Sequence, residues 1–242
     1  MMLRAPLRKV GIIGGMGPEA TVLLMAKVIE RTSATDDADH VPMFVDNNTQ
    51  VPSRIKALIE GGGEDPGPVL ANMARGLEVA GAEALAMPCN TAHNYAPAIV
   101  EATTIPFLDM VELAAERVAA MKAGSFSVGI LASPAIRLTG IYERAFAKRH
   151  ITTLFPSDDE RMLAAIRAIK ISSANAAARE TLSVAADELI KAGADALLVA
   201  CSEFSIVTDA ISGKYRVVDS IDVLADAIVK FATTGLNTSV IR

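Results

Sequence analysis

The segment Val10-Gly11-Ile12-Ile13-Gly14-Gly15-Met16-Gly17-Pro18-Glu19-Ala20 decides the fold. It predicts a short buried strand, a glycine loop and a helix start, because proline is favoured in the first helical position. The spacing of Gly15, Gly17 and Ala20 also fits a loose dinucleotide fingerprint. Glu19, however, would place a carboxylate where a pyrophosphate binds at a helix N-terminus. We therefore expect the loop to bring the backbone close to a small ligand rather than to a nucleotide.

Short apolar runs and longer amphipathic segments alternate along the rest of the chain, a pattern typical of parallel α/β folds. The first half predicts strands near 10–13, 43–45, 84–87 and 106–108, and the second half predicts them near 128–131, 151–154, 196–200 and 216–218. Helices are expected at 19–31, 69–79, 110–121, 161–169 and 176–191. The equal number of strands in the two halves suggests an internal repeat.

Three pairs of segments, in the same order in each half, support a duplication. They are Val10-Gly11-Ile12-Ile13 with Val128-Gly129-Ile130-Leu131, Gly81-Ala82-Glu83-Ala84-Leu85 with Gly193-Ala194-Asp195-Ala196-Leu197, and Phe107-Leu108-Asp109 with Val217-Val218-Asp219. Parallel α/β segments resemble one another in general, but three ordered matches favour duplication.

The two cysteines occupy equivalent positions of this repeat. Cys89 and Cys201 each follow a predicted strand, and their spacing equals that of Gly81 and Gly193. In open parallel sheets, ligands bind beyond the carboxyl ends of the strands. A free cysteine is most often a small buried apolar residue. Here, however, polar residues that suit a helix start follow each thiol, and a helix N-terminus lowers a thiol pKa from about 8.5. We therefore predict that both thiols act at one cleft.

Two opposed thiols suit proton transfer at an α-carbon. Racemisation needs a base on one face and an acid on the other, and a thiolate and a thiol can exchange these roles. The carbanion requires fixed donors around its carboxylate. Backbone amides near Asn90, Thr91 and Ser202 are the expected donors. This chemistry needs no cofactor.

Metal binding is not indicated. His40, His93 and His150 are irregularly spaced and give no zinc signature. The acidic run 36–39 is expected to be a solvated loop, since no further carboxylates follow it at ligand spacing. His93 is a candidate ligand or base, although a packing or helix-start role is favoured.

Composition excludes several other classes. The 242 residues are 51% hydrophobic with a net charge of −5, so a large core is available. Nucleic-acid binding is not expected, because basic residues are scattered, tryptophan is absent and aromatics make up 4%. No segment has the length of a signal sequence or a membrane span. We therefore expect a cytoplasmic protein with two free thiols.

Several motifs resemble those of the aspartate/glutamate racemase family and, within it, the aspartate racemases. The motifs are Gly-Gly-Met-Gly-Pro at 14–18, Asn-Asn-Thr-Gln-Val-Pro-Ser-Arg at 47–54, Gly-Glu-Asp-Pro at 63–66, Pro-Cys-Asn-Thr-Ala-His at 88–93, Gly-Ile-Tyr-Glu at 140–143 and Cys-Ser-Glu at 201–203. The likeness covers essentially the whole chain, and the two cysteine motifs are its most specific part.

This resemblance implies two similar flavodoxin-like domains related by pseudo-two-fold symmetry, each with a four-stranded parallel sheet. The expected domains are 1–112 and 113–242, with the helix at about 220–234 a candidate to pack back on the first. The resemblance also implies a homodimer, no pyridoxal phosphate, and Cys89 and Cys201 as the acid/base pair. Substrate-binding residues are then expected at Met16, Arg54, Asn90, Thr91, Ser133, Lys170 and Ser202.

The substrate is the open question. Arg54 and Lys170 match the family's cationic positions and favour a dicarboxylate such as aspartate or glutamate. The loop Ser133-Pro134-Ala135-Ile136 departs from the family pattern because it keeps a single hydroxyl. Hydantoin racemases and maleate isomerases share the expected fold and thiols, and a non-catalytic binder of acidic amino acids is a third reading. Retention of both cysteines argues against the binder.

Overall fold

Two four-stranded parallel sheets form the centre of the protein. The computed structural model describes residues 7–121, 124–172 and 175–234. The first sheet has the order β2-β1-β3-β4 and the second has the order β6-β5-β7-β8. The strands are β1 (Val10–Gly14), β2 (Met43–Asn47), β3 (Ala84–Ala86), β4 (Phe107–Leu108), β5 (Ser127–Ala132), β6 (Thr152–Leu154), β7 (Ala196–Ala200) and β8 (Val217–Asp219). Every strand expected from the sequence is present, and the α/β fold with two similar halves is confirmed.

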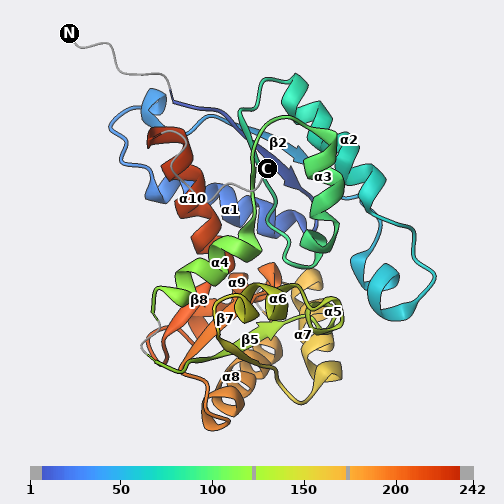
Figure 1. Ribbon diagram of the computed structural model, residues 1–242, viewed down its shortest axis with the longest axis vertical. Helices are drawn as coiled ribbons and strands as arrows, with labels where there is room; N and C mark the ends of the chain where they lie inside the picture. Colours follow the sequence, from blue (N-terminus) through green and yellow to red (C-terminus); the bar gives the residue numbers. More distant parts are fainter. Residues whose placement is uncertain (1–6, 122–123, 173–174, 235–242) are drawn as a thin grey trace.

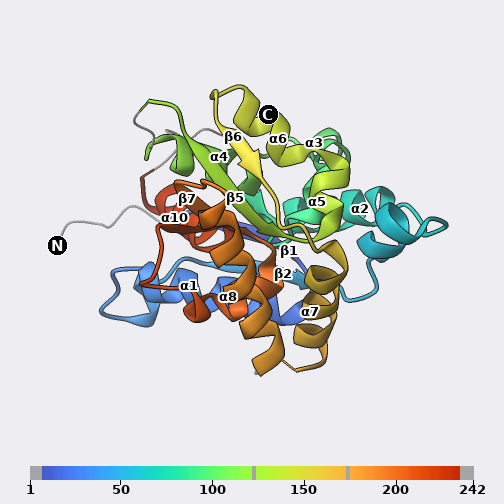
Figure 2. The ribbon, with the colours of Figure 1, turned by 90° about the horizontal axis from the view of Figure 1, so that it is seen from below.

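Helices cover both sheets (Figures 1 and 2). They are α1 (Pro18–Arg31), α2 (Gly67–Val79), α3 (Ala96–Ala102), α4 (Met110–Ala119), α5 (Pro134–Thr139), α6 (Ile141–Ala147), α7 (Asp159–Ile171), α8 (Ala176–Lys191), α9 (Ser202–Ile206) and α10 (Ser220–Thr234). Short 3₁₀ turns lie at Asp37–Asp39, Thr91–Tyr95 and Thr208–Ala210, and a π-helical turn lies at Lys56–Glu60.

The duplication is visible in the packing of the first strand of each half. A Cβ at Gly11 of β1 would lie 2.9 Å from Leu85 and 3.0 Å from Leu77 of α2. A Cβ at Gly129 of β5 would lie 2.9 Å from both Leu197 and Leu189 of α8. In both halves glycine therefore allows a helix to approach the central strand closely.

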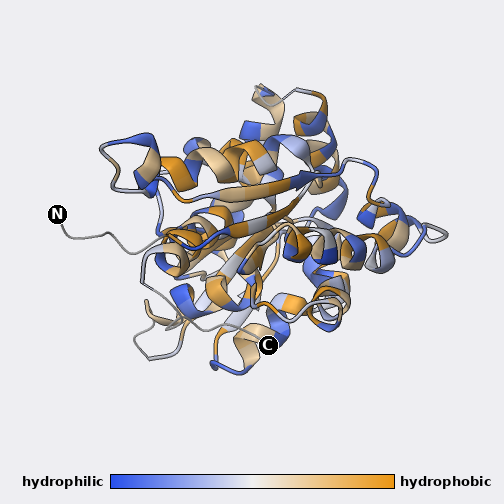
Figure 3. Ribbon diagram, turned by 90° about the horizontal axis from the view of Figure 1, so that it is seen from above, coloured by the Kyte–Doolittle hydropathy of each residue, from blue (hydrophilic) through white to orange (hydrophobic). Residues whose placement is uncertain are grey.

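A shared apolar core joins the halves. Its largest cluster includes Val10 and Leu24 from the first half, Val128 from the second, and Leu224 and Phe231 from α10. Helix α10 packs against both α1 and α4, and Figure 1 shows α4 at the junction of the halves. In Figure 3 the strands are mostly hydrophobic, whereas hydrophilic residues gather on loops and outer helix faces. The interior of the molecule is thus continuous from one sheet to the other.

Ion pairs at the edge of this core also connect the halves. The Arg31 guanidinium of α1 pairs with Asp222 at 2.8 Å and with Asp226 at 3.0 Å, both on α10. Arg117 of α4 reaches Asp226 at 2.8 Å. These partly exposed pairs contribute little individually. They lie where three helices meet and add to the apolar contacts there.

Candidate active site

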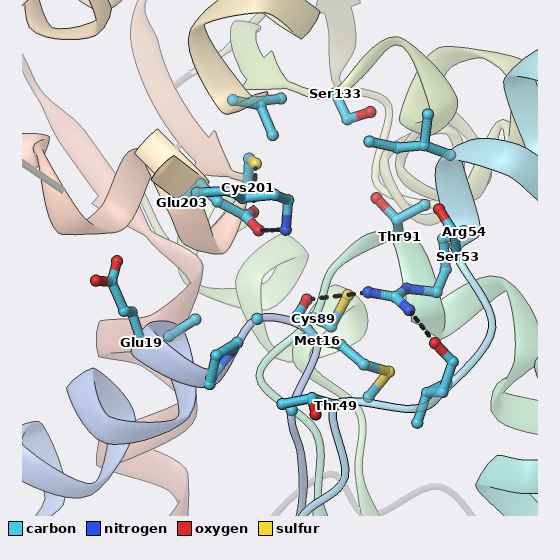
Figure 4. A pocket seen from close by; sticks show the side chains of 18 of the residues that line it. Met16, Glu19, Thr49, Ser53, Arg54, Cys89, Thr91, Ser133, Cys201 and Glu203 are labelled. Carbon is cyan, nitrogen blue, oxygen red and sulfur yellow. Dashed lines mark hydrogen bonds and ion pairs between the residues drawn. The ribbon is translucent and has the colours of Figure 1, made fainter. Parts of the chain in front are cut away.

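A cavity of about 520 Å³ lies between the two halves, and both cysteines line it. Seven of the nine site residues expected from the sequence line this cavity. They are Met16, Arg54, Cys89, Thr91, Ser133, Lys170 and Cys201. Cys89 follows β3 and Cys201 follows β7, so the cavity lies beyond the carboxyl ends of equivalent strands, as parallel sheets predict. Figure 4 shows side chains from both halves facing this space.

The glycine loop after β1 forms one wall of the cavity. Gly15 has φ +90°, and a Cβ there would lie 2.3 Å from the backbone oxygen of Asn48. The Gly15 amide donates to the Thr21 hydroxyl at 3.0 Å, which ties the loop to α1. Only glycine permits this approach between the ends of β1 and β2. Gly15, Met16 and Gly17 of this loop line the cavity.

The loop that carries Cys89 is fixed by His93. The Nδ1 atom of His93 lies 2.8 Å from the Cys89 carbonyl oxygen, and the Met110 amide donates to Nε2 at 3.1 Å. Nε2 must therefore be the acceptor and Nδ1 must carry the proton. The ring also packs on Phe107, with centroids 5.4 Å apart. His93 thus supports the loop of the first thiol and does not line the cavity.

Cys201 has a different environment. It is 5% exposed at the start of α9, and its thiol donates to Oε2 of Glu203 at 3.2 Å. Burial and the nearby Glu203 carboxylate raise the pKa of the Cys201 thiol well above its usual value, while the amides of Phe204 and Glu203 oppose this. The expectation of a lowered thiol pKa at a helix start is thus reversed at Cys201, because desolvation and a like charge outweigh the helix amides.

Glu203 lines the cavity but was not among the site residues expected from the sequence. Its Oε1 atom pairs with the Lys170 ammonium from α7, while Oε2 accepts from the thiol. Burial lowers the pKa of Lys170, whereas the Glu203 carboxylate and, beside it, the two cysteines raise it, and the net shift is upward. Lys170 is therefore charged and already has a carboxylate partner. The motif Cys-Ser-Glu was a visible signal, but the pairing with Lys170 depends on tertiary structure.

Arg54 is the second cation of the cavity. Its guanidinium donates to the carbonyl oxygens of Pro52 at 2.9 Å, Val51 at 3.2 Å and Met16 at 3.4 Å. Within residues 7–121, 124–172 and 175–234, no carboxylate forms an ion pair with it. Its positive charge is thus held in position by carbonyl groups and left available for an anionic ligand.

Asn90 and Ser202, two residues expected to bind the substrate, have side chains that hydrogen-bond to other protein groups. The Asn90 amide donates to the Ser220 hydroxyl at 3.0 Å and accepts from the Tyr142 hydroxyl at 2.6 Å. The Ser202 hydroxyl donates to the Pro88 carbonyl at 2.7 Å. Both side chains are 2% exposed, so their polar groups need these partners. These side chains therefore join the two halves next to the thiols, and the expectation that backbone amides near Asn90 and Ser202 bind the ligand stays a prediction.

No group of three or more histidine, cysteine, aspartate or glutamate side chains in the described part of the chain could hold a metal ion. Among the helices of those same residues, none has the length and apolar character needed to cross a membrane.

Comparisons with known proteins identify the family of the chain. The Asp/Glu/hydantoin racemase family matches residues 13–228. Aspartate racemase from Picrophilus torridus is 33% identical, with a TM-score of 0.84 over 93% of this chain and 94% of that one. The broad specificity amino-acid racemase RacX of Bacillus subtilis (strain 168) is 27% identical over 238 residues, covering 91% of this chain and 96% of that protein.

A more distant structure shares the architecture. Glutamate racemase from Francisella tularensis, solved with D-glutamate, is 16% identical and has a TM-score of 0.67, covering 97% of this chain and 85% of that one. At this identity the likeness concerns the fold alone. The family match spans both halves and both cysteine motifs. The chain therefore belongs to the Asp/Glu/hydantoin racemase family and is an isomerase of the racemase type.

Proposed function

We propose that the protein is a cofactor-independent racemase of acidic amino acids, with aspartate preferred, in which Cys89 and Cys201 act on opposite faces of the α-carbon. The observation that supports this most strongly is the arrangement of the two thiols. Each follows the same strand of its half, and both line one cavity between the halves. Racemisation needs two such groups, whereas a binding protein does not.

The mechanism requires one thiolate and one thiol. The thiolate removes the α-proton and becomes a thiol, while the other thiol gives its proton to the opposite face and becomes a thiolate. The substrate is inverted and the number of protons is unchanged. Backbone amides and Arg54 can stabilise the negative charge that develops on the substrate carboxylate. Neither a metal nor pyridoxal phosphate has to take part.

The charges of the cavity favour a dicarboxylic substrate. Arg54 has no carboxylate partner among the described residues, so it can bind one carboxylate of the substrate. Lys170 can interact with a second carboxylate, in competition with Glu203. Hydroxyl groups of Thr49, Ser53 and Thr91 line the same cavity and can donate to either carboxylate. The similarity to an aspartate racemase points the same way.

The decisive experiment measures α-deuteration in heavy water. The purified protein is incubated with L-aspartate, L-glutamate, L-alanine, a substituted hydantoin and maleate, without pyridoxal phosphate and with a chelator. We expect deuterium and the D-enantiomer to appear fastest with aspartate. Isomerised maleate or racemised hydantoin in place of amino-acid turnover would overturn the proposed substrate class.

Cysteine variants test the mechanism. Cys89→Ala and Cys201→Ala should each reduce racemisation about 10²–10⁴-fold, since that is the typical contribution of one general acid–base group. Circular dichroism and thermal unfolding should show that both variants remain folded. Near-wild-type turnover in either folded variant would contradict the two-thiol mechanism.

On family grounds we also propose a cytoplasmic homodimer. Sedimentation would test the oligomeric state, and cell fractionation would test the localisation.

A further inference from the structure

The two thiols of the cavity have unequal surroundings. The Cys201 thiol donates a hydrogen bond to Glu203 at 3.2 Å. Among the described residues, no hydrogen bond reaches the sulfur of Cys89, whose loop is held through its backbone carbonyl by His93. Figure 4 shows Glu203 and Cys201 together on one side of the cavity and Cys89 on the other. The duplication therefore provides two equivalent thiols but only one with a carboxylate beside it.

We propose that Glu203 is a positioning residue that keeps the proton on Cys201, so that Cys89 is the thiolate in the enzyme that meets its substrate. This inference rests on the proposed two-thiol racemisation and adds an order of events to it. Cys89 takes the α-proton first, and Cys201 delivers its own proton to the opposite face.

The hydrogen bond between Cys201 and Glu203 exists only while the thiol is protonated. Ionising Cys201 would place two negative groups 3.2 Å apart. Both residues are nearly buried, at 5% and 8% exposure, where like charges repel strongly. Lys170 fixes the other oxygen of the Glu203 carboxylate, which holds the carboxylate in place beside the thiol. Burial and this carboxylate both raise the pKa of the Cys201 thiol.

The other charged groups that line the cavity do not have this role. Arg54 is held by backbone carbonyls, and Lys170 pairs with Glu203. Glu19 is a second carboxylate of the lining, but it is exposed and lies apart from both thiols in Figure 4. Glu19 therefore offers a matched control that removes the same charge without touching a thiol.

One turnover leaves the protons exchanged. Cys89 has gained the α-proton and Cys201 has become a thiolate beside Glu203. The enzyme returns to its starting form either by converting a molecule of the opposite enantiomer or by exchanging protons with water. Because Glu203 disfavours the Cys201 thiolate, the starting form dominates in the free enzyme.

Competitive alkylation of the free enzyme tests this assignment. Wild-type protein is treated with limiting iodoacetamide at pH 7 without substrate, and mass spectrometry of peptides measures the labelling rate of each cysteine. Because the thiolate is the nucleophile, we expect Cys89 to be labelled at least about tenfold faster than Cys201. In Glu203→Gln the labelling rate of Cys201 should rise about tenfold or more and begin at a lower pH, as one pKa unit changes the thiolate fraction about tenfold.

Three controls separate the alternatives. Glu19→Gln should leave the labelling ratio unchanged. The double variant Glu203→Gln with Lys170→Met should keep the raised labelling of Cys201; a return to the wild-type ratio would mean that the freed ammonium caused the change. Circular dichroism should show that each variant is folded. The ratio of Cys89 to Cys201 labelling in wild-type protein tests the proposal without any variant.

Two results would overturn the role of Glu203: equal labelling of the two thiols in wild-type protein, or an unchanged ratio in folded Glu203→Gln. Either could occur while Cys89→Ala and Cys201→Ala still abolish racemisation, so the proposed function would stand. Conversely, active cysteine variants would overturn the function whatever the labelling ratio.

Discussion

At the scale of single residues, the two cations of the cavity are not equivalent. The sequence placed Arg54 and Lys170 together as carboxylate-binding positions. In the structure Lys170 already pairs with Glu203, whereas Arg54 is held by carbonyl oxygens. An incoming carboxylate therefore meets the full charge of Arg54, but it must compete with Glu203 for Lys170. We expect Arg54 to dominate anion binding.

Arg54→Ala should lower kcat/KM for aspartate by about ten- to a hundredfold or more, because a charge-assisted hydrogen bond contributes about 1.5–3 kcal/mol. Racemisation of alanine, measured by the same deuteration assay, should fall far less. The matched control is Lys56→Ala, which removes an exposed cation two positions away that does not line the cavity. An equal loss with aspartate and alanine would show that Arg54 holds the α-carboxylate, and the argument for a dicarboxylic substrate would fail.

The repeat and the motifs of the sequence predicted several of the residues that line the cavity. They could not predict side-chain hydrogen bonds between residues far apart in the sequence. Cys89 and Cys201 follow from strand order alone. Glu203 was identified only as part of the motif Cys-Ser-Glu, because its ion-pair partner Lys170 lies 33 positions away in the sequence. Asn90 was expected to bind the ligand because of the backbone amides in its loop and the family resemblance, and nothing in the sequence indicated partners for its side chain. Its actual partners, Tyr142 and Ser220, lie 52 and 130 positions away. No local pattern reports such contacts.

At the scale of elements, the long helices were predicted within about two residues because their apolar periodicity is clear. The helix start after Cys201 was expected from its polar residues, and α9 begins there. The short helices α3, α5 and α6 were not predicted, since six or seven residues are too few to show a period. Tertiary contacts and caps define them instead; the Ser133 hydroxyl, for example, accepts from the Ala135 amide at 3.3 Å at the start of α5. The strand, glycine loop and helix start predicted at residues 10–20 are also present, with Pro18 in the first turn of α1.

Two glycine substitutions should have opposite effects on stability. Gly15→Ala should lower the free energy of unfolding by about 2 kcal/mol or more, because it combines φ +90° with a clash against the Asn48 backbone. Gly76→Ala, in the exposed middle of α2 where nothing lies within 4 Å of an added Cβ, should raise it by about 0.5–1 kcal/mol. Urea unfolding measures both. A Gly15→Ala variant as stable as wild type would show that the loop can move away from β2.

At the scale of the whole molecule, the proposed two-thiol catalysis depends on how the halves are held together, because each half contributes one thiol to the cavity. The apolar core and α10 provide most of the contact between them. Directly behind Cys89, a buried polar connection crosses the boundary: the Tyr142 hydroxyl donates to Asn90, which donates to Ser220. The sequence predicted two halves and a shared cleft, but it could not predict this connection. We infer that it fixes the position of Cys89 relative to the second half.

Tyr142→Phe tests this inference. The change keeps the ring and removes the hydroxyl, so the buried Asn90 oxygen loses its donor, at a cost of about 1–3 kcal/mol in stability. If the connection positions Cys89, kcat should fall several-fold or more while KM for aspartate changes little, because the residues that contact substrate are untouched. The control is Tyr215→Phe, which removes a hydroxyl that bonds Asp187 away from the boundary between the halves. It should lower stability without changing kcat. If Tyr142→Phe loses stability but keeps the wild-type kcat, the connection supports the fold alone, and the apolar core must suffice to align the thiols.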